Sequence, residues 1–251
     1  MTATLPVGAS EAVEVRDAAT VLLLRDGDDG LEVAMLRRRL DSGFVPGAYV
    51  FPGGALDEGD RSPGWAARSA GLDDASASAR LALPAGGLAY WVAAVRECFE
   101  EAGVLVARHA DGRPLIVEGT GAAARFGRHR AGVDEGRVEL LDVFAAEGLH
   151  LPAGELHYFA RWITPEPAPR RYDTRFFVGR APAGHSLRAD GREAVAALWI
   201  RPADALARCR AGAFELIRPT EHSLEVLADF ADTDAALAAA ATARLGMEPP
   251  A

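Results

Sequence analysis

The stretch Arg96-Glu97-Cys98-Phe99-Glu100-Glu101-Ala102-Gly103-Val104 indicates how the rest of the chain is arranged. On a helix that advances about 100° per residue, Glu100 and Glu101 fall within about 60° of Glu97, so the three carboxylates share one narrow face. The opposite face is apolar and consists of Trp91, Val92, Val95, Cys98, Phe99 and Ala102. Gly103 stands where a left-handed helix end is expected. The run 104–106 (Val-Leu-Val) then predicts a buried strand.

The acidic face has two interpretations. It is either a solvated face of an ordinary amphipathic helix or a metal site. Three adjacent carboxylates repel one another, and a divalent cation would relieve that repulsion. Oxygen ligands from neighbouring helical turns suit Mg²⁺ or Mn²⁺, and substrate phosphates can complete the coordination. Arg96 lies beside Glu100 on the helix and can orient a carboxylate.

A second motif lies upstream, in the run 47–60 (GAYVFPGGALDEGD). Its adjacent glycines Gly53 and Gly54 suit a loop that approaches a ligand closely. Together the two motifs resemble the Nudix box, G-x5-E-x7-R-E-U-x-E-E-x-G-U, where U is a large aliphatic residue. Gly54 matches its first glycine and Asp60 its first acid, although Asp60 replaces a glutamate. The gap of seven residues is here 35 residues long, 61–95.

This resemblance implies an α+β fold, the Nudix α/β/α sandwich, in which a mixed β-sheet lies between helices. The domain is expected to span 15–212, after a flexible N-terminus of residues 1–14. A helical insertion, 61–95, interrupts the box and forms either a lid or substrate wall, or a surface ornament. Residues 213–251 form a C-terminal helical extension.

Local patterns predict the other elements. Strands are expected at 18–25 and 31–36, joined as a hairpin, and at 155–163, 171–179 and 195–200. Helices are expected at 73–83, from about 88, at 138–147, 202–210 and over most of 221–245.

The resemblance also implies roles for single residues. Glu97, Glu100 and Glu101 would bind the metal, and Arg96 would hold Glu97 in place. Either Glu97 or Glu193 would be the catalytic base, because Glu193 precedes Trp199 by six residues, where Nudix proteins often carry a functional glutamate. The backbone N–H groups of Gly53 and Gly54 would reach the phosphates.

Three consecutive arginines, 37–39, follow the second expected strand. They form either a solvated rim or a phosphate contact that involves Arg38 and Arg39.

Other residues resemble a long-insertion Nudix subfamily that includes peroxisomal coenzyme A diphosphatases. They are the split box, the pair of segments 162–165 and 171–177, and the half-signature Gly47-x3-Phe51-Pro52-Gly53-Gly54. Gly43 departs from the full signature, which has an arginine there. The subfamily implies metal-dependent hydrolysis of a nucleoside diphosphate linked to another moiety, with coenzyme A or acyl-coenzyme A as candidates. The alternative is a Nudix-fold module that binds or senses a nucleotide without hydrolysis.

Composition excludes several classes of protein. All 27 basic residues are arginine, so there is no Walker lysine and no Schiff-base lysine. The net charge of −9 argues against general nucleic-acid binding. The sequence offers no long apolar run and no secretory signal, and Cys98 and Cys209 form no disulfide framework. We therefore expect a cytoplasmic enzyme with a small-molecule nucleotide substrate and no membrane partner; a homodimer remains an open alternative.

Overall fold

The computed structural model describes residues 13–41, 45–242 and 245. The described part opens with a hairpin of two long strands, β1 (Val15–Gly27) and β2 (Gly30–Arg38), which confirms the predicted pair. Of the expected N-terminal segment, 1–14, only the last two residues are described.

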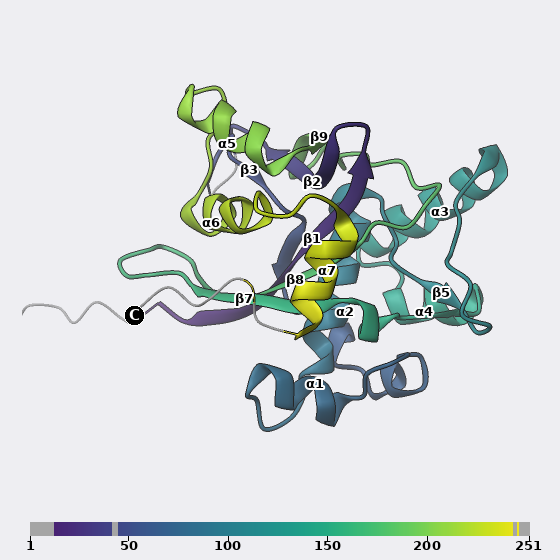
Figure 1. Cartoon of the computed structure of the whole chain (residues 1–251). Coiled ribbons are helices and arrows are strands. Elements are labelled where there is room, and N and C mark those ends of the chain that lie inside the picture. Colours follow the sequence, from purple (N-terminus) through teal and green to yellow (C-terminus); the bar gives the residue numbers. More distant parts are fainter. Residues whose placement is uncertain (1–12, 42–44, 243–244, 246–251) are drawn as a thin grey trace, which may run out of the picture.

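The hairpin lies at the centre of a mixed sheet (Figure 1). Within the described residues this sheet has seven strands, in the order β3-β2-β1-β8-β7, with β4 paired to β1 and β9 paired to β2. β1 and β8 run parallel, and the other pairs are antiparallel. The remaining strands of the sheet are β3 (Tyr49–Val50), β4 (Gly53–Ala55), β7 (His157–Ile163), β8 (Arg171–Arg180) and β9 (Ala194–Ile200).

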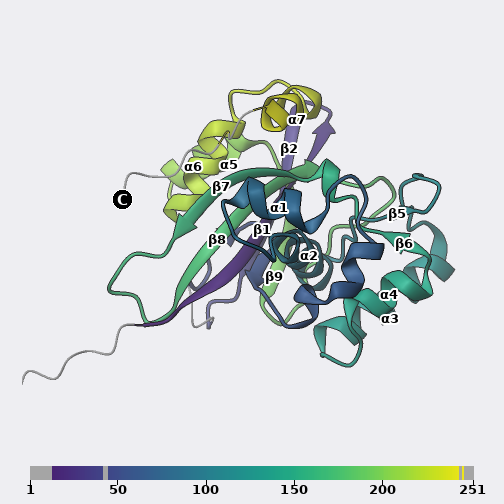
Figure 2. The ribbon, with the colours of Figure 1, turned by 90° about the horizontal axis from the view of Figure 1, so that it is seen from below.

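Helices cover both faces of the sheet, because β1 is apolar on both of its faces (Figure 2). Val21 and Leu23 belong to one buried cluster, and Leu22 and Leu24 to the other. The first cluster packs against α1 (Asp74–Leu81), α2 (Leu88–Glu97), α3 (Gly119–Asp134) and α4 (Leu140–Ala146). The second packs against α5 (Pro202–Arg210), α6 (Arg218–Leu227) and α7 (Thr233–Thr242). The expected α/β/α sandwich, a mixed sheet between helices, is confirmed.

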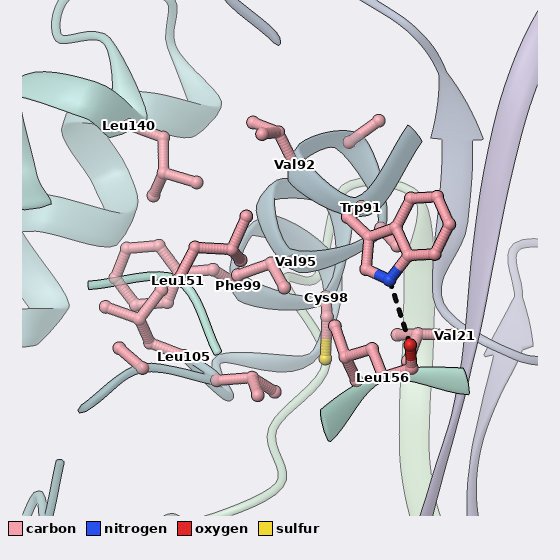
Figure 3. Close-up of a cluster of buried hydrophobic side chains, with 14 of the residues drawn as sticks. Val21, Trp91, Val92, Val95, Cys98, Phe99, Leu105, Leu140, Leu151 and Leu156 are labelled. Atoms are coloured by element: carbon pink, nitrogen blue, oxygen red, sulfur yellow. Dashed lines mark hydrogen bonds between the residues drawn. The ribbon is translucent and has the colours of Figure 1, made fainter. Parts of the chain in front are cut away.

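The apolar face of α2 packs as its periodicity predicts (Figure 3). Trp91, Val95 and Cys98 are fully buried, and Phe99 is nearly so. The Nε1–H group of Trp91 donates to the carbonyl oxygen of Leu156 at 2.9 Å, so the buried ring keeps a polar partner. This face fixes which side of the helix turns away from the core.

One local prediction was wrong, and one helix was not predicted. Residues 104–106 are buried but form no strand; the neighbouring strand pair is β5 (Arg108–His109) with β6 (Leu149–His150). The apolar run reflects burial, and burial alone does not specify a strand. The long helix α3 was not predicted, because its sequence is rich in glycine and buries few apolar side chains. The expectation that most of 221–245 is helical is confirmed within the described residues, where α6 and α7 cover it except for 228–232.

The insertion, 61–95, packs into the domain and is not a surface ornament. It contains the 3₁₀ turn Pro63–Ala67, α1 and most of α2, and it follows a shorter turn, Gly59–Arg61. Trp65 is 2% exposed and meets the ring of Phe144 at 5.1 Å, edge to face. Ala70 N–H donates to the carbonyl oxygen of Leu151, which precedes the 3₁₀ turn Ala153–Glu155. The insertion therefore forms part of the core. No helix in the described part of the chain has the length and apolar character to cross a membrane.

Candidate active site

Arg96 is the centre of the polar cluster at the end of α2. Its side chain is 8% exposed, and its Nε and Nη2 atoms donate to the two oxygens of Asp60, each at 2.9 Å. Nη1 donates to Oε1 of Glu97 at 2.9 Å and to Oε2 of Glu100 at 3.2 Å. Nη2 also donates to the carbonyl oxygen of Ala55 at 2.8 Å. One guanidinium thus binds three carboxylates and a β4 carbonyl group.

Asp60 is the site residue whose role sequence reasoning missed. Its side chain is 1% exposed, and besides Arg96 it binds the backbone N–H of Asp57 at 2.8 Å. Its match to the first acid of the box was the available signal. With 35 residues between them, the sequence did not indicate that Asp60 is a direct partner of Arg96. The structure brings these two ends of the insertion together.

The acidic stretch is not one continuous α-helix. α2 ends at Glu97, and a π-helical turn, Cys98–Ala102, follows. Gly103 has φ 71°, the left-handed conformation expected there. π-turns are rare and frequently occur at functional sites. The turn keeps Phe99 in the core, and Glu101 is only 6% exposed. The simple picture of a solvated acidic face is therefore wrong for Glu101.

The two glycines of β4 pack against the protein itself. The N–H of Gly53 donates to Oε2 of Glu101 at 2.9 Å, so in this structure it orients a carboxylate and is not free for phosphate. A Cβ on Gly53 would come within 2.3 Å of Oγ1 of Thr20, and one on Gly54 within 2.5 Å of Oε1 of Glu97. Gly53 allows β4 to pair closely with β1, and Gly54 leaves room for the Glu97 carboxylate.

Burial makes the ionised forms of these carboxylates costly. It raises the pKa of Glu97 to about 8 and that of Glu100 to about 7, although Arg96 opposes both shifts. Burial and the charge of Glu97 raise the pKa of Glu101 well above its ordinary value. Burial also raises the pKa of Asp60, against the hydrogen bonds from Arg96. A single guanidinium therefore faces more carboxylates than it can neutralise.

This donor set fits a hard divalent cation, because it consists of several buried carboxylates with too little positive charge nearby. Within the described ranges, however, no group of three Asp, Glu, His or Cys side chains converges in a way that could hold a metal ion. Glu97 and Glu100 turn toward Arg96, and Glu101 turns toward Gly53.

Glu193 lies close to this cluster, on the loop before β9. Oε2 of Glu193 is 3.6 Å from Nη2 of Arg38, and its side chain is 63% exposed. The charge of Glu193 raises the pKa of Glu101, and that of Arg38 lowers it, after the larger effect of burial. The structure therefore brings Glu193 and Arg38 toward the carboxylates that the sequence singled out.

The three consecutive arginines point in different directions, because side chains alternate along β2. The guanidinium of Arg37 lies 5.9 Å from the ring centre of Tyr49, on the side of the second cluster. Arg39 follows the strand; its side chain pairs with Asp41, and its backbone N–H donates to the carbonyl oxygen of Glu193. Of the three arginines, Arg38 is the one that lies within β2 and whose side chain pairs with the Glu193 carboxylate.

Comparison with known proteins shows which family this chain is similar to. A family model described as the NUDT19 Nudix domain matches residues 66–224, more than half of the chain. The human acyl-coenzyme A diphosphatase NUDT19 is 30% identical over 233 residues, which cover 81% of this chain and 62% of that protein. The Gallus gallus protein of the same name is 31% identical over 264 residues, with 86% and 68% covered. The chain thus spans about two thirds of the length of these relatives.

A solved structure is similar over nearly its whole length. It is a NUDIX hydrolase from Alicyclobacillus acidocaldarius, 30% identical, with a TM-score of 0.75. The similarity covers 90% of this chain and 97% of that one.

Proposed function

The chain belongs to the Nudix family, and we propose from this that it hydrolyses the diphosphate of a nucleoside diphosphate linked to another moiety, with Mg²⁺ or Mn²⁺ as cofactor. The observation that carries the proposal is the group of buried carboxylates around Arg96. Four carboxylates here have raised pKa values, chiefly through burial. Three of them, Asp60, Glu97 and Glu100, share the Arg96 guanidinium as a close partner. Burying such a group destabilises the ligand-free protein, and carboxylates with raised pKa values are typical of functional sites. Binding of a cation and phosphates would offset that cost.

In this proposal Glu97, Glu100 and Glu101 hold the cation. When bound, the cation neutralises phosphate oxygens and makes a coordinated water more acidic. Arg96 keeps Glu97 and Glu100 in place through Nη1, and Asp60 keeps Arg96 in place. Glu97 or Glu193 takes the proton from the attacking water; of the two, Glu193 is the more exposed and keeps a carboxylate available to solvent.

Arg38 and Arg39 are proposed to contact substrate phosphate, Arg38 from within the site and Arg39 from its rim. Gly54 contributes by leaving the Glu97 carboxylate its space, and Gly53 by orienting Glu101. These roles support diphosphate chemistry because each places either positive charge or an oriented carboxylate at one end of α2.

For the substrate we propose coenzyme A or an acyl-coenzyme A. The names of the relatives from Homo sapiens and Gallus gallus support this class. The insertion supplies no argument for this class, because Trp65, which anchors it, is a core residue.

The test is a substrate panel with purified protein. It includes coenzyme A, acyl-coenzyme A, NADH, ADP-ribose, dinucleoside polyphosphates and nucleoside triphosphates, each with Mg²⁺, Mn²⁺ or EDTA. We expect cleavage of coenzyme A species at the diphosphate, identified by mass spectrometry, and none with EDTA. Preference for triphosphates would refute the substrate class. Tight nucleotide binding without any turnover would refute hydrolysis and favour the sensor alternative.

A further inference from the structure

Arg130, on α3, closes the end of the π-helical turn that carries the glutamates. Its Nε donates to the carbonyl oxygen of Glu100 and its Nη2 to that of Glu101, both at 2.9 Å. The last carbonyl groups of a helix lack intrahelical donors, and a cation is favourable at that negative end. The side chain of Arg130 therefore supplies hydrogen bonds that the turn cannot make for itself.

The same guanidinium holds a second segment of the chain. Nη2 of Arg130 donates to the carbonyl oxygen of Arg188 at 3.0 Å, and the N–H of Arg188 donates to the carbonyl oxygen of Ala102 at 2.9 Å. Two residues later, the Asp190 carboxylate accepts the N–H of Glu193 at 2.9 Å. A continuous series of contacts thus runs from the glutamate-bearing turn to the loop that bears Glu193.

α3 is anchored to that loop at another point as well. Nη1 of Arg192 lies 2.6 Å from Oδ2 of Asp134, one helical turn beyond Arg130. The loop 188–193 is therefore tied to α3 on both sides of Asp190.

Gly103 makes the approach of Arg130 possible. A Cβ at position 103 would lie 2.9 Å from Nη1 of Arg130, in addition to the strain of its positive φ. The glycine that ends the turn thus also provides the space in which the guanidinium sits.

We propose that Arg130 is a positioning residue, which fixes the turn of Glu100 and Glu101 relative to the loop of Glu193. The inference rests on the proposed function, because it assigns those glutamates to the reaction. Arg130 acts through backbone carbonyl groups and touches no substrate. Its effect is to hold two catalytic segments, about ninety residues apart in sequence, at one spacing.

The test compares Arg130→Gln with Arg128→Gln, a matched control at an exposed arginine on the same helix. Mn²⁺ binding is measured without substrate by the electron paramagnetic resonance signal of free Mn²⁺, and kcat and KM are measured with coenzyme A. We expect Arg130→Gln to weaken Mn²⁺ binding and to lower kcat, each about tenfold, as loss of an outer partner of metal ligands typically does. KM should change less than about threefold, since no substrate contact is lost.

Arg130→Lys should restore part of kcat, because an ammonium can bind some of the three carbonyl groups. If Arg130→Gln does not fold, the lysine variant is judged by the same two measurements. Mn²⁺ affinity and kcat equal to those of Arg128→Gln, with only a lower melting temperature, would overturn the proposal. Failure of the proposed function looks different: the unmodified protein would then cleave no diphosphate substrate at all.

Discussion

Asp60 and Arg96 lie 36 positions apart in the sequence, yet both oxygens of the Asp60 carboxylate accept hydrogen bonds from the Arg96 guanidinium at 2.9 Å. Both side chains are buried, and Arg96 in turn holds Glu97 and Glu100. The Asp60–Arg96 pair therefore joins the two ends of the insertion, and through Arg96 it also positions the candidate metal ligands Glu97 and Glu100.

We expect Asp60→Asn to destabilise the protein by about 1–3 kcal/mol, because the amide group offers one acceptor oxygen where the buried Arg96 guanidinium now donates to two. It should also lower kcat, because Arg96 loses its two-point attachment. Urea denaturation and steady-state kinetics measure the two effects. Asp57→Asn is the control: Asp57 is 64% exposed and 3.6 Å from Arg96, so its loss should cost less than about 1 kcal/mol. Equal effects for the two variants would contradict the assignment.

Alanine substitutions of the two β4 glycines should differ in effect: one should lower kcat and the other should lower stability. In Gly54→Ala the new methyl group meets the mobile end of Glu97, so we expect normal stability and a kcat lowered about tenfold or more. In Gly53→Ala the methyl group meets the backbone of β1 and Thr20, so we expect a stability loss of about 1–3 kcal/mol. Thermal melts and kinetics separate the two, and a Gly54→Ala variant with full activity would show that Glu97 tolerates displacement.

Glu97→Gln and Glu101→Gln should each lower kcat about 10²-fold, which is typical for loss of an acid–base or electrostatic group. Neither should melt below the unmodified protein in metal-free buffer, because a neutral amide avoids the cost of a buried charge. Glu118→Gln, at an exposed position, serves as the control. Unfolding of either variant, or nearly normal turnover, would show that these glutamates support the fold and not the reaction.

Stability of the metal-free protein should fall as pH rises from about 4.5 to about 8. Glu97 keeps its proton in the folded state up to about 8, whereas in the unfolded chain it releases it near 4.5. The unfolded state then binds fewer protons over this window, so the free energy of unfolding decreases with pH. Mg²⁺ or Mn²⁺ should reverse the trend, because the cation binds the ionised carboxylates.

The contribution of Glu97 can be isolated by following the unmodified protein and Glu97→Gln by urea denaturation across this range. The unmodified protein should lose stability relative to the variant as pH rises. A difference that stays constant, or grows in the other direction, would refute the raised pKa.

Local patterns predicted the parts of the site that depend on one segment. The apolar face of α2 and the burial of Cys98 and Phe99 in the turn that follows it were predicted from helical spacing alone. The direction of Arg38 also follows from a local rule, strand alternation, although the sequence analysis left it open. These features need no knowledge of distant residues.

The parts that depend on distant segments were not predictable in this way. Glu101 is buried because β4 covers it and Gly53 donates to it across 48 positions. The π-helical turn is held from outside by Arg130, on a helix whose glycine-rich sequence gave no clear signal. The insertion is part of the core because Trp65 meets Phe144, a contact that no pattern within 61–95 indicates.

The parallel pairing of β1 with β8 has a consequence for how the chain reaches its structure. The register runs from Val15 opposite Arg171 to Leu24 opposite Arg180, so β1 is synthesised long before its partner exists. Until β8 has been synthesised, the apolar run Val21–Leu24 has no partner strand on that side. Strand pairings between segments so far apart in sequence are slow to form. We expect refolding to be slow, and fragments that end before β8 to aggregate. Stopped-flow fluorescence and the solubility of a fragment ending at residue 165 would measure both.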